Sequence, residues 1–216
     1  MNQGTMSGFM NGFYRYGEYF ILLLYLNLLW LCFTLLGGIV FGWAPSTTAM
    51  FAVLRQWIKG EEGPVFTTFW KTYRQEFLRS NGLGIMIVVM AYVLYVNLQF
   101  FYVETTWLFV AVRFMMIAIM ITSSVMLLYI FPLMVHYEAS LFRLIKNAWI
   151  MVILKPFRTL FTVGACVIVT QILFVFPILI IFLGVSLTGL VIMWTTHFTF
   201  RSIEQKQKEL QEQESI

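Results

Sequence analysis

The sequence contains few charged residues and few of the side chains from which soluble catalytic sites are built. Only 11% of its 216 residues are charged, against about 25% in ordinary soluble domains. There are two histidines and two cysteines, with no CxxC motif or other metal-ligand spacing. No P-loop, dinucleotide-binding fingerprint or Gly-rich phosphate loop occurs. These absences argue against a soluble enzyme, a metalloprotein and an ATPase, so we expect no catalytic residue, no cofactor and no metal site.

Apolar residues are abundant instead, at 60% of the chain. A soluble fold of this size could not bury so much apolar surface, whereas a lipid bilayer removes the need to bury it. Five runs reach the length of about 20 residues that a crossing requires. They lie at about residues 19–41, 82–102, 110–135, 157–176 and 178–198. The sequence therefore predicts an all-α polytopic membrane helix bundle in one membrane domain, residues 1–200, with a polar cytoplasmic tail, residues 201–216.

The distribution of lysine and arginine predicts the orientation of the chain. Counted over residues 1–18, 43–81, 103–113 and 136–158, the connection at Pro177 and the tail, their numbers are 1, 5, 1, 4, 0 and 3. Basic loops stay in the cytoplasm, so we expect the N-terminus outside and the C-terminus in the cytoplasm. These loops also explain the net charge of +4. With no soluble domain to present a basic face, we expect no binding to nucleic acid.

The first basic loop is expected to contain two amphipathic helices at the cytoplasmic interface. Pro45 should end or kink the first crossing, and hydroxyl residues around Thr48 suit the start of a helix over about 47–59. A second helix over about 64–80 has aromatic residues on one face and basic and polar residues on the other. Its aromatic face fits the membrane interface or packing on the crossing helices equally well. The stretch 138–155 occupies a similar place, which leaves open a diverged internal repeat.

Polar side chains within the apolar runs are neutral, and three of them are amides, Asn27, Asn97 and Gln171. Such groups usually hydrogen-bond neighbouring helices in the membrane. The alternative is that these three line a path for a polar solute. A serine protease site is disfavoured, because Ser186 and His197 on one helix would be separated by roughly 16 Å.

A series of motif residues runs through residues 26–81. It comprises Asn-Leu-Leu-Trp in the first crossing, a proline followed by Thr-Ala, an arginine one helix later, a Phe-x-x-x-Lys helix and a closing Arg-Ser-Asn. In this chain these are Asn27, Trp30, Pro45, Thr48, Ala49, Arg55, Phe69 or Phe66, and Arg79 to Asn81. This pattern resembles the defining region of the YesL family of bacterial membrane proteins, and the five-crossing layout is similar too. This chain departs from the pattern at Trp43-Ala44, because residues closer to glycine are expected before the proline.

The resemblance implies a protein of the bacterial cytoplasmic membrane in a family whose biochemical function is not established. Members accompany carbohydrate uptake systems, including ABC-type sugar permeases, and two-component sensors. We therefore expect a non-catalytic accessory or regulatory partner of a carbohydrate uptake or sensing system, whose partners are the lipid bilayer and an ABC-type sugar permease or a sensor kinase. The alternative is a small transporter or channel for a polar solute that assembles as a homo-oligomer.

Overall fold

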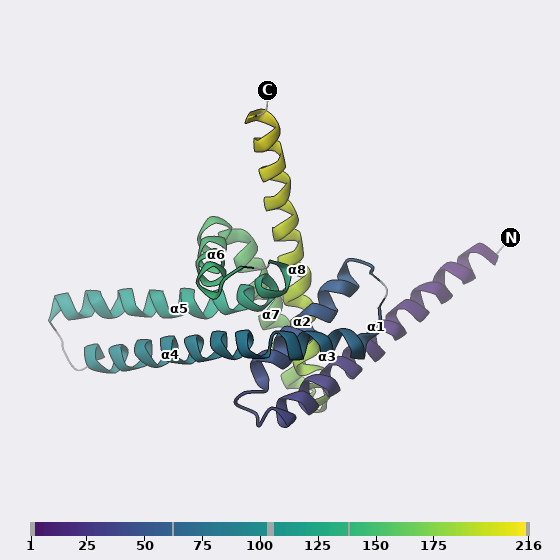
Figure 1. Ribbon diagram of the computed structural model, residues 1–216, viewed down its shortest axis with the longest axis horizontal. Coiled ribbons are helices and arrows are strands. Elements are labelled where there is room, and N and C mark those ends of the chain that lie inside the picture. The colour runs from purple at the N-terminus through teal and green to yellow at the C-terminus, as the bar shows by residue number, and fades with distance from the viewer. Residues whose placement is uncertain (1–2, 62, 103–105, 138, 215–216) are drawn as a thin grey trace.

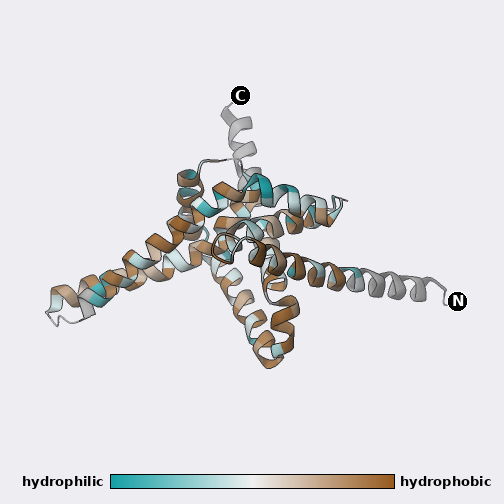
Figure 2. Ribbon diagram, turned by 60° about the horizontal axis from the view of Figure 1, so that its bottom comes forward, coloured by the Kyte–Doolittle hydropathy of each residue, from teal (hydrophilic) through white to brown (hydrophobic). Residues whose placement is uncertain are grey.

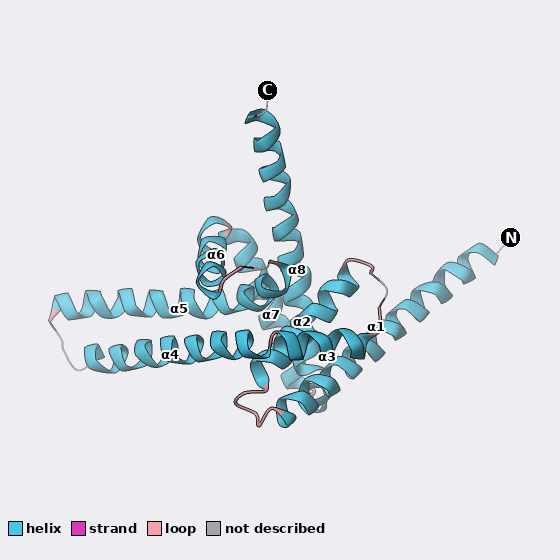
Figure 3. Ribbon diagram, viewed as in Figure 1, coloured by secondary structure: helices cyan, strands magenta, loops and turns pink. Residues whose placement is uncertain are grey.

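The computed structural model describes residues 3–61, 63–102, 106–137 and 139–214. Side chains are described for residues 17–61, 63–99, 106–137 and 139–200. Every regular element in the described ranges is a helix, which confirms the all-α prediction (Figures 1 and 3). In chain order the helices are α1 (Gln3–Leu36), α2 (Trp43–Ile58), α3 (Val65–Gln75), α4 (Phe77–Tyr102), α5 (Trp107–His136), α6 (Leu141–Leu154), α7 (Pro156–Val175) and α8 (Pro177–Glu214).

Five of these helices contain a stretch that is long and apolar enough to cross a bilayer, as the sequence predicts. The stretches are Gly17–Leu36 in α1, Phe77–Gln99 in α4, Trp107–His136 in α5, Pro156–Val175 in α7 and Pro177–Phe200 in α8. Figure 2 shows hydrophobic residues along most of their described length. The last helix continues to Glu214 without interruption, so the backbone of the polar tail extends the fifth crossing helix.

The first crossing ends at Leu36, five residues earlier than expected, and Pro45 is not what ends it. The chain turns at Gly38 and Ile39, both of which have positive φ. A Cβ on Gly37 would collide with the backbone of Gly42, so this turn requires glycine at its closest approach. Pro45 is instead the third residue of α2. Its missing N–H is tolerated there, because the first N–H groups of a helix have no partner within it.

Helix α2 lies in the core, and this corrects the expectation of a helix at the membrane surface that begins near residue 47. It runs antiparallel to α1, with the Trp30 indole donating to Thr47 Oγ1 at 3.0 Å and the Tyr19 and Trp57 rings 4.3 Å apart. Gly189 of α8 has no side chain, which leaves room for Met50 and Leu54 of α2 to pack against it. Helix α2 packs among α1, α4, α5 and α8, so apolar side chains on more than one of its faces are buried. These side chains are Ala49, Met50, Phe51, Val53 and Leu54.

The pairing of α2 with α1 bears on the predicted topology. Trp57 near the end of α2 packs on Tyr19, near the start of the first candidate span. The charge count places residues 1–18 and residues 43–81 on opposite sides of the bilayer. The structure places Trp57, which lies within the second segment, beside Tyr19, which directly follows the first segment. The position of the N-terminus outside the membrane stays a prediction from the charge count.

The aromatic face of α3 packs on α1. The Phe33 ring lies 5.2 Å from Phe69 and 5.0 Å from Tyr73, and the Tyr73 hydroxyl donates to the Phe33 carbonyl at 3.2 Å. Phe66 and Trp70, at the edge of this face, are about half exposed. The helix ends at Gln75, so the closing Arg-Ser-Asn motif belongs to the first turns of α4 and not to the surface helix.

Two helical hairpins, α4 with α5 and α7 with α8, leave the core in different directions (Figures 1 and 2). None of the described side chains of residues 85–99, 106–122 and 174–182 is buried. The other ends of the same helices meet each other. The His136 and Phe200 rings lie 4.8 Å apart, and the Arg158 guanidinium donates to the Phe198 carbonyl at 2.8 Å. The basic ends of the candidate spans therefore gather in one region.

Candidate functional site

A polar cavity of about 490 Å³ lies in the region where the basic helix ends meet. Its walls come from the C-terminal half of α2, the polar face of α3, the first turn of α4 and the end of α5. The residues that carry its charge and hydrogen-bonding groups are Arg55, Gln56, Glu61, Thr68, Lys71, Thr72, Gln75, Glu76, Arg79, His136 and Tyr137. Volumes of this size are typical of sites that hold a small ligand.

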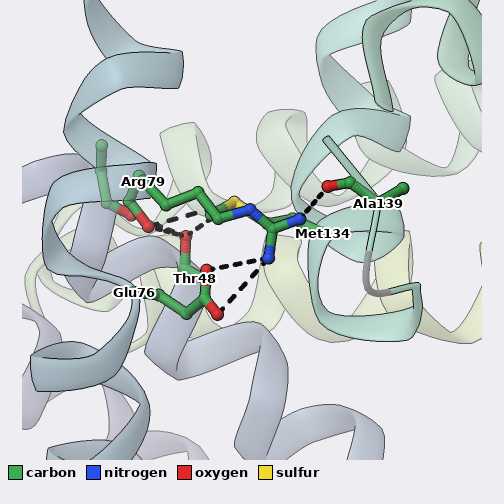
Figure 4. A network of polar contacts seen from close by, with 7 residues as sticks. Thr48, Glu76, Arg79, Met134 and Ala139 are labelled. Atoms are coloured by element: carbon green, nitrogen blue, oxygen red, sulfur yellow. Dashed lines mark hydrogen bonds and ion pairs between the residues drawn. The ribbon is translucent and has the colours of Figure 1, made fainter. Parts of the chain in front are cut away.

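The Arg79 side chain in the cavity wall is held by contacts on two sides (Figure 4). Its guanidinium forms an ion pair with Glu76 at 3.3 Å, one turn earlier on the chain. The same guanidinium donates to the main-chain carbonyl of Ala139. The first turn of α4 is thereby joined to the connection between α5 and α6. Because both side chains of the ion pair are only 28% exposed, the solvent screens this pair less than it would a pair on the open surface.

A buried hydroxyl pair adjoins the cavity. Thr48 Oγ1 of α2 and Ser80 Oγ of α4 share a hydrogen bond of 2.8 Å, and both residues are fully buried. Both hydroxyls also contact the Met134 sulfur of α5, at 3.8 and 4.0 Å. Figure 4 shows this cluster beside the Arg79 guanidinium. Three helices are thus joined by polar contacts next to the cavity.

Two basic residues of the cavity have no ion-pair partner within the described part of the chain. Arg55 Nε is buried and has no hydrogen-bond partner there, although the residue as a whole is partly exposed. Lys71 is exposed on the polar face of α3. The described carboxylates of the cavity are both engaged, Glu76 by Arg79 and Glu61 by Lys59 at 3.8 Å. The uncompensated charge of the described wall is therefore positive.

Comparison with known proteins gives the family of the chain. A family model described as "Protein of unknown function, DUF624" matches residues 23–98. Among curated proteins of Bacillus subtilis (strain 168), the uncharacterized protein YesV is 39% identical over 83% of this chain and 87% of its own length. The uncharacterized proteins YteU and YesL are 34% and 31% identical, over 94% and 92% of this chain and 91% and 94% of their own lengths. The chain belongs to the DUF624 family. No solved structure matches it.

The segment that matches the DUF624 model contains α2, α3 and the first turn of α4, which build most of the cavity wall. Of the motif residues from the sequence, Arg55 and Arg79 line the cavity and Thr48 lies beside it. The others have structural positions. Phe69 is buried against α1, Pro45 is buried in the first turn of α2, and the amide of Asn81 donates to the Phe77 carbonyl of its own helix.

Asn27 is a link between α1 and α8. Its amide nitrogen donates to the Ile181 carbonyl at 2.6 Å, and its oxygen accepts from the backbone N–H groups of Val185 and Ser186 at 3.1 and 3.2 Å. The side chain is buried. Its amide thus lies beside the hydrogen-bonded turn that joins Ile181 to Val185, which matches the structural role that the sequence favours for buried amides.

The structure does not bring together the three amides of the solute path that the sequence left as the alternative. Asn97 donates to the Val93 carbonyl of its own helix at 2.7 Å. Gln171 is exposed on α7, beside an open apolar groove that also contains Cys166 and Thr170. Asn27 has its polar atoms directed at α8. Periodicity cannot tell which way an amide faces when a helix is apolar on every side, and that is why the sequence left this point open.

Other features from the sequence also have a place in the structure. Ser186 and His197 lie on the one uninterrupted helix α8, so no break brings them together. No group of three His, Cys, Asp or Glu side chains converges among the described residues. The cavity residues Thr68, Lys71 and Gln75 were visible in the sequence only as the polar face of a surface helix. Nothing in the sequence indicated that this face would meet Arg55 and the end of α5.

Proposed function

We propose that this DUF624 protein is a non-catalytic integral membrane protein that acts as an accessory or regulatory partner of a carbohydrate uptake or sensing system. The observation that carries the proposal is the polar cavity at the basic ends of the helices, with the motif arginines Arg55 and Arg79 in its wall. A surface of this kind is suited to receive a charged group from another molecule. The carbohydrate system is the partner that the family resemblance implies.

The arrangement of the deep polar groups supports this role over transport. Substrate sites of transporters lie near the middle of the bilayer, where polar groups face a common cavity. Here the amide of Asn27 is used in three contacts with α8, and Asn97 is bonded within its own helix. The large polar cavity lies instead at the end of the helices.

Site-specific photocrosslinking in the native bacterium tests the proposal. A crosslinking amino acid at Gln75, which is exposed and lines the cavity, is expected to capture one membrane subunit of a sugar permease or a sensor kinase. The matched control carries the same amino acid at Val89, which is exposed near the middle of α4 and does not line the cavity. Capture of the same subunit from both positions would mean that the subunit touches the protein at many places and does not bind at the cavity. Capture of a second copy of this chain alone, together with solute flux in reconstituted vesicles, would replace the proposal by the transporter alternative.

A further inference from the structure

We infer that the polar cavity is a binding site for a phosphate-type anion, either the headgroup of an anionic phospholipid or a soluble phosphate compound. The inference concerns the ligand of the cavity and does not depend on the identity of any protein partner. It rests on the charges in the wall, the buried donor of Arg55 and the way in which Arg79 is held.

The charge of the described wall favours an anion. The carboxylates of Glu61 and Glu76 each have a basic partner, Lys59 and Arg79. Two further basic residues face the same cavity with no described carboxylate paired to them. A phosphate group carries the one or two negative charges that would balance Arg55 and Lys71.

Arg55 supplies the donor that is missing an acceptor. Its Nε is shielded from water and has no hydrogen-bond partner in the described structure. A buried donor without an acceptor costs free energy, and that cost is removed when the Arg55 side chain, which is partly exposed at the cavity, turns this N–H towards a ligand oxygen. The guanidinium fork also matches two oxygens of one phosphate, so a single ligand satisfies the charge and the geometry together.

The rest of the wall is suited to hold such a ligand in place. Thr72 and Gln75 contribute neutral donors from α3, beside Lys71. Arg79 is held by Glu76 and the Ala139 carbonyl, so it keeps the α4 and α5 walls in position. A wall that is positioned before binding loses less entropy when the ligand binds. Both sources of phosphate are compatible with a cavity at the ends of membrane-spanning helices.

Two arms of one experiment distinguish the sources. In the first, the full chain in nanodiscs of pure phosphatidylcholine is dialysed against radiolabelled inorganic phosphate. In the second, the protein is purified from vesicles of phosphatidylcholine and phosphatidylglycerol, and the phosphatidylglycerol that it retains is counted. Saturable binding in the first arm identifies a soluble phosphate compound, and retention of about one lipid per chain in the second identifies a headgroup. The absence of both would overturn the inference.

A matched pair of double variants tests whether Arg55 and Lys71 hold the anion. R55Q/K71Q is expected to weaken binding about tenfold or more, since each lost bond is charge-assisted. The control R143Q/K146Q removes the same charge from exposed positions on α6, outside the lining of the cavity, and should stay within about twofold of the wild type. Equal loss in both variants would mean that only net charge matters, and the site would be refuted.

A variant that binds the anion more tightly must be folded, so a gain of affinity tests the site without the ambiguity of a variant that fails to fold. Gln75 is exposed at the cavity wall, so a substitution there disturbs no core contact. Q75K is expected to tighten binding roughly threefold and Q75E to weaken it by a similar factor, because an exposed charge acts modestly. Both effects should shrink as the salt concentration rises. Identical affinities for Q75K and Q75E would contradict an anion at this position.

Discussion

The substitution Asn27→Leu provides the sharpest test of how the bundle is held together. Leucine has a similar size, so the change removes three hydrogen bonds to α8 and creates little empty space. Hydrogen bonds between membrane helices contribute about 0.6 kcal/mol each on average, so the expected loss of stability is about 2 kcal/mol. The backbone groups of α8 can still bond within their own helix, which keeps the loss from being larger. The same substitution at Asn97 is the control, because its amide bonds only to its own helix.

The free energy of unfolding of both variants can be measured by titrating the purified protein with sodium dodecyl sulfate in mixed micelles. We expect Asn27→Leu to unfold at clearly lower detergent fraction than the wild type, and Asn97→Leu to lie within about 0.5 kcal/mol of it. Equal effects of the two substitutions would refute the assignment of Asn27 as a link between α1 and α8.

Three further predictions concern the packing at Gly37, Thr48 and Tyr73. Gly37→Ala should destabilise the protein by about 1–3 kcal/mol, because its Cβ would collide with the backbone of Gly42 and with the Tyr73 hydroxyl. The control Gly164→Ala should be neutral or stabilising in the same titration, because no atom lies near the added Cβ. Thr48→Val should cost about 1 kcal/mol, and a double-mutant cycle with Ser80→Ala should show that the two losses are not additive, since both remove one hydrogen bond. Burial raises the pKa of the Tyr73 phenol above its usual 10.0, so the folded state favours the neutral form. The stability that this residue contributes is fully present below pH 10 and is lost as the pH rises through the raised pKa of the folded state. Unfolding measured between pH 8 and pH 11 should therefore show a steeper decline for the wild type than for Tyr73→Phe, and parallel curves would contradict this.

The sequence identified the crossings because a bilayer imposes a length and a composition on every helix that spans it. The runs are apolar enough that their number needs no tertiary information. Their boundaries were less predictable, as the end of α1 shows. The turn at Gly37 depends on the backbone of Gly42 and on Tyr73, and such contacts across a turn leave little trace in hydropathy.

Helix α2 shows where reading the sequence failed. Its apolar core is too short to cross a membrane, and a charged end follows, so a surface position was the plain expectation. Burial was decided by partners distant in the chain, among them Trp30, Gly189 and Phe131. Burial on several faces requires neighbours on several sides, and the sequence of the helix does not state which neighbours it will have.

What the sequence determined by itself is the class of the protein, its five membrane-crossing helices and its membership of a family, because these follow from composition and from local motifs. The tertiary structure alone decided that Arg55, Lys71 and Arg79 share one cavity. The physical reason is that these residues lie on three different helices, α2, α3 and α4, and only the packing of these helices against one another brings their charges together. The packing of α1 against α8 directed Asn27 towards α8 and away from a shared polar path.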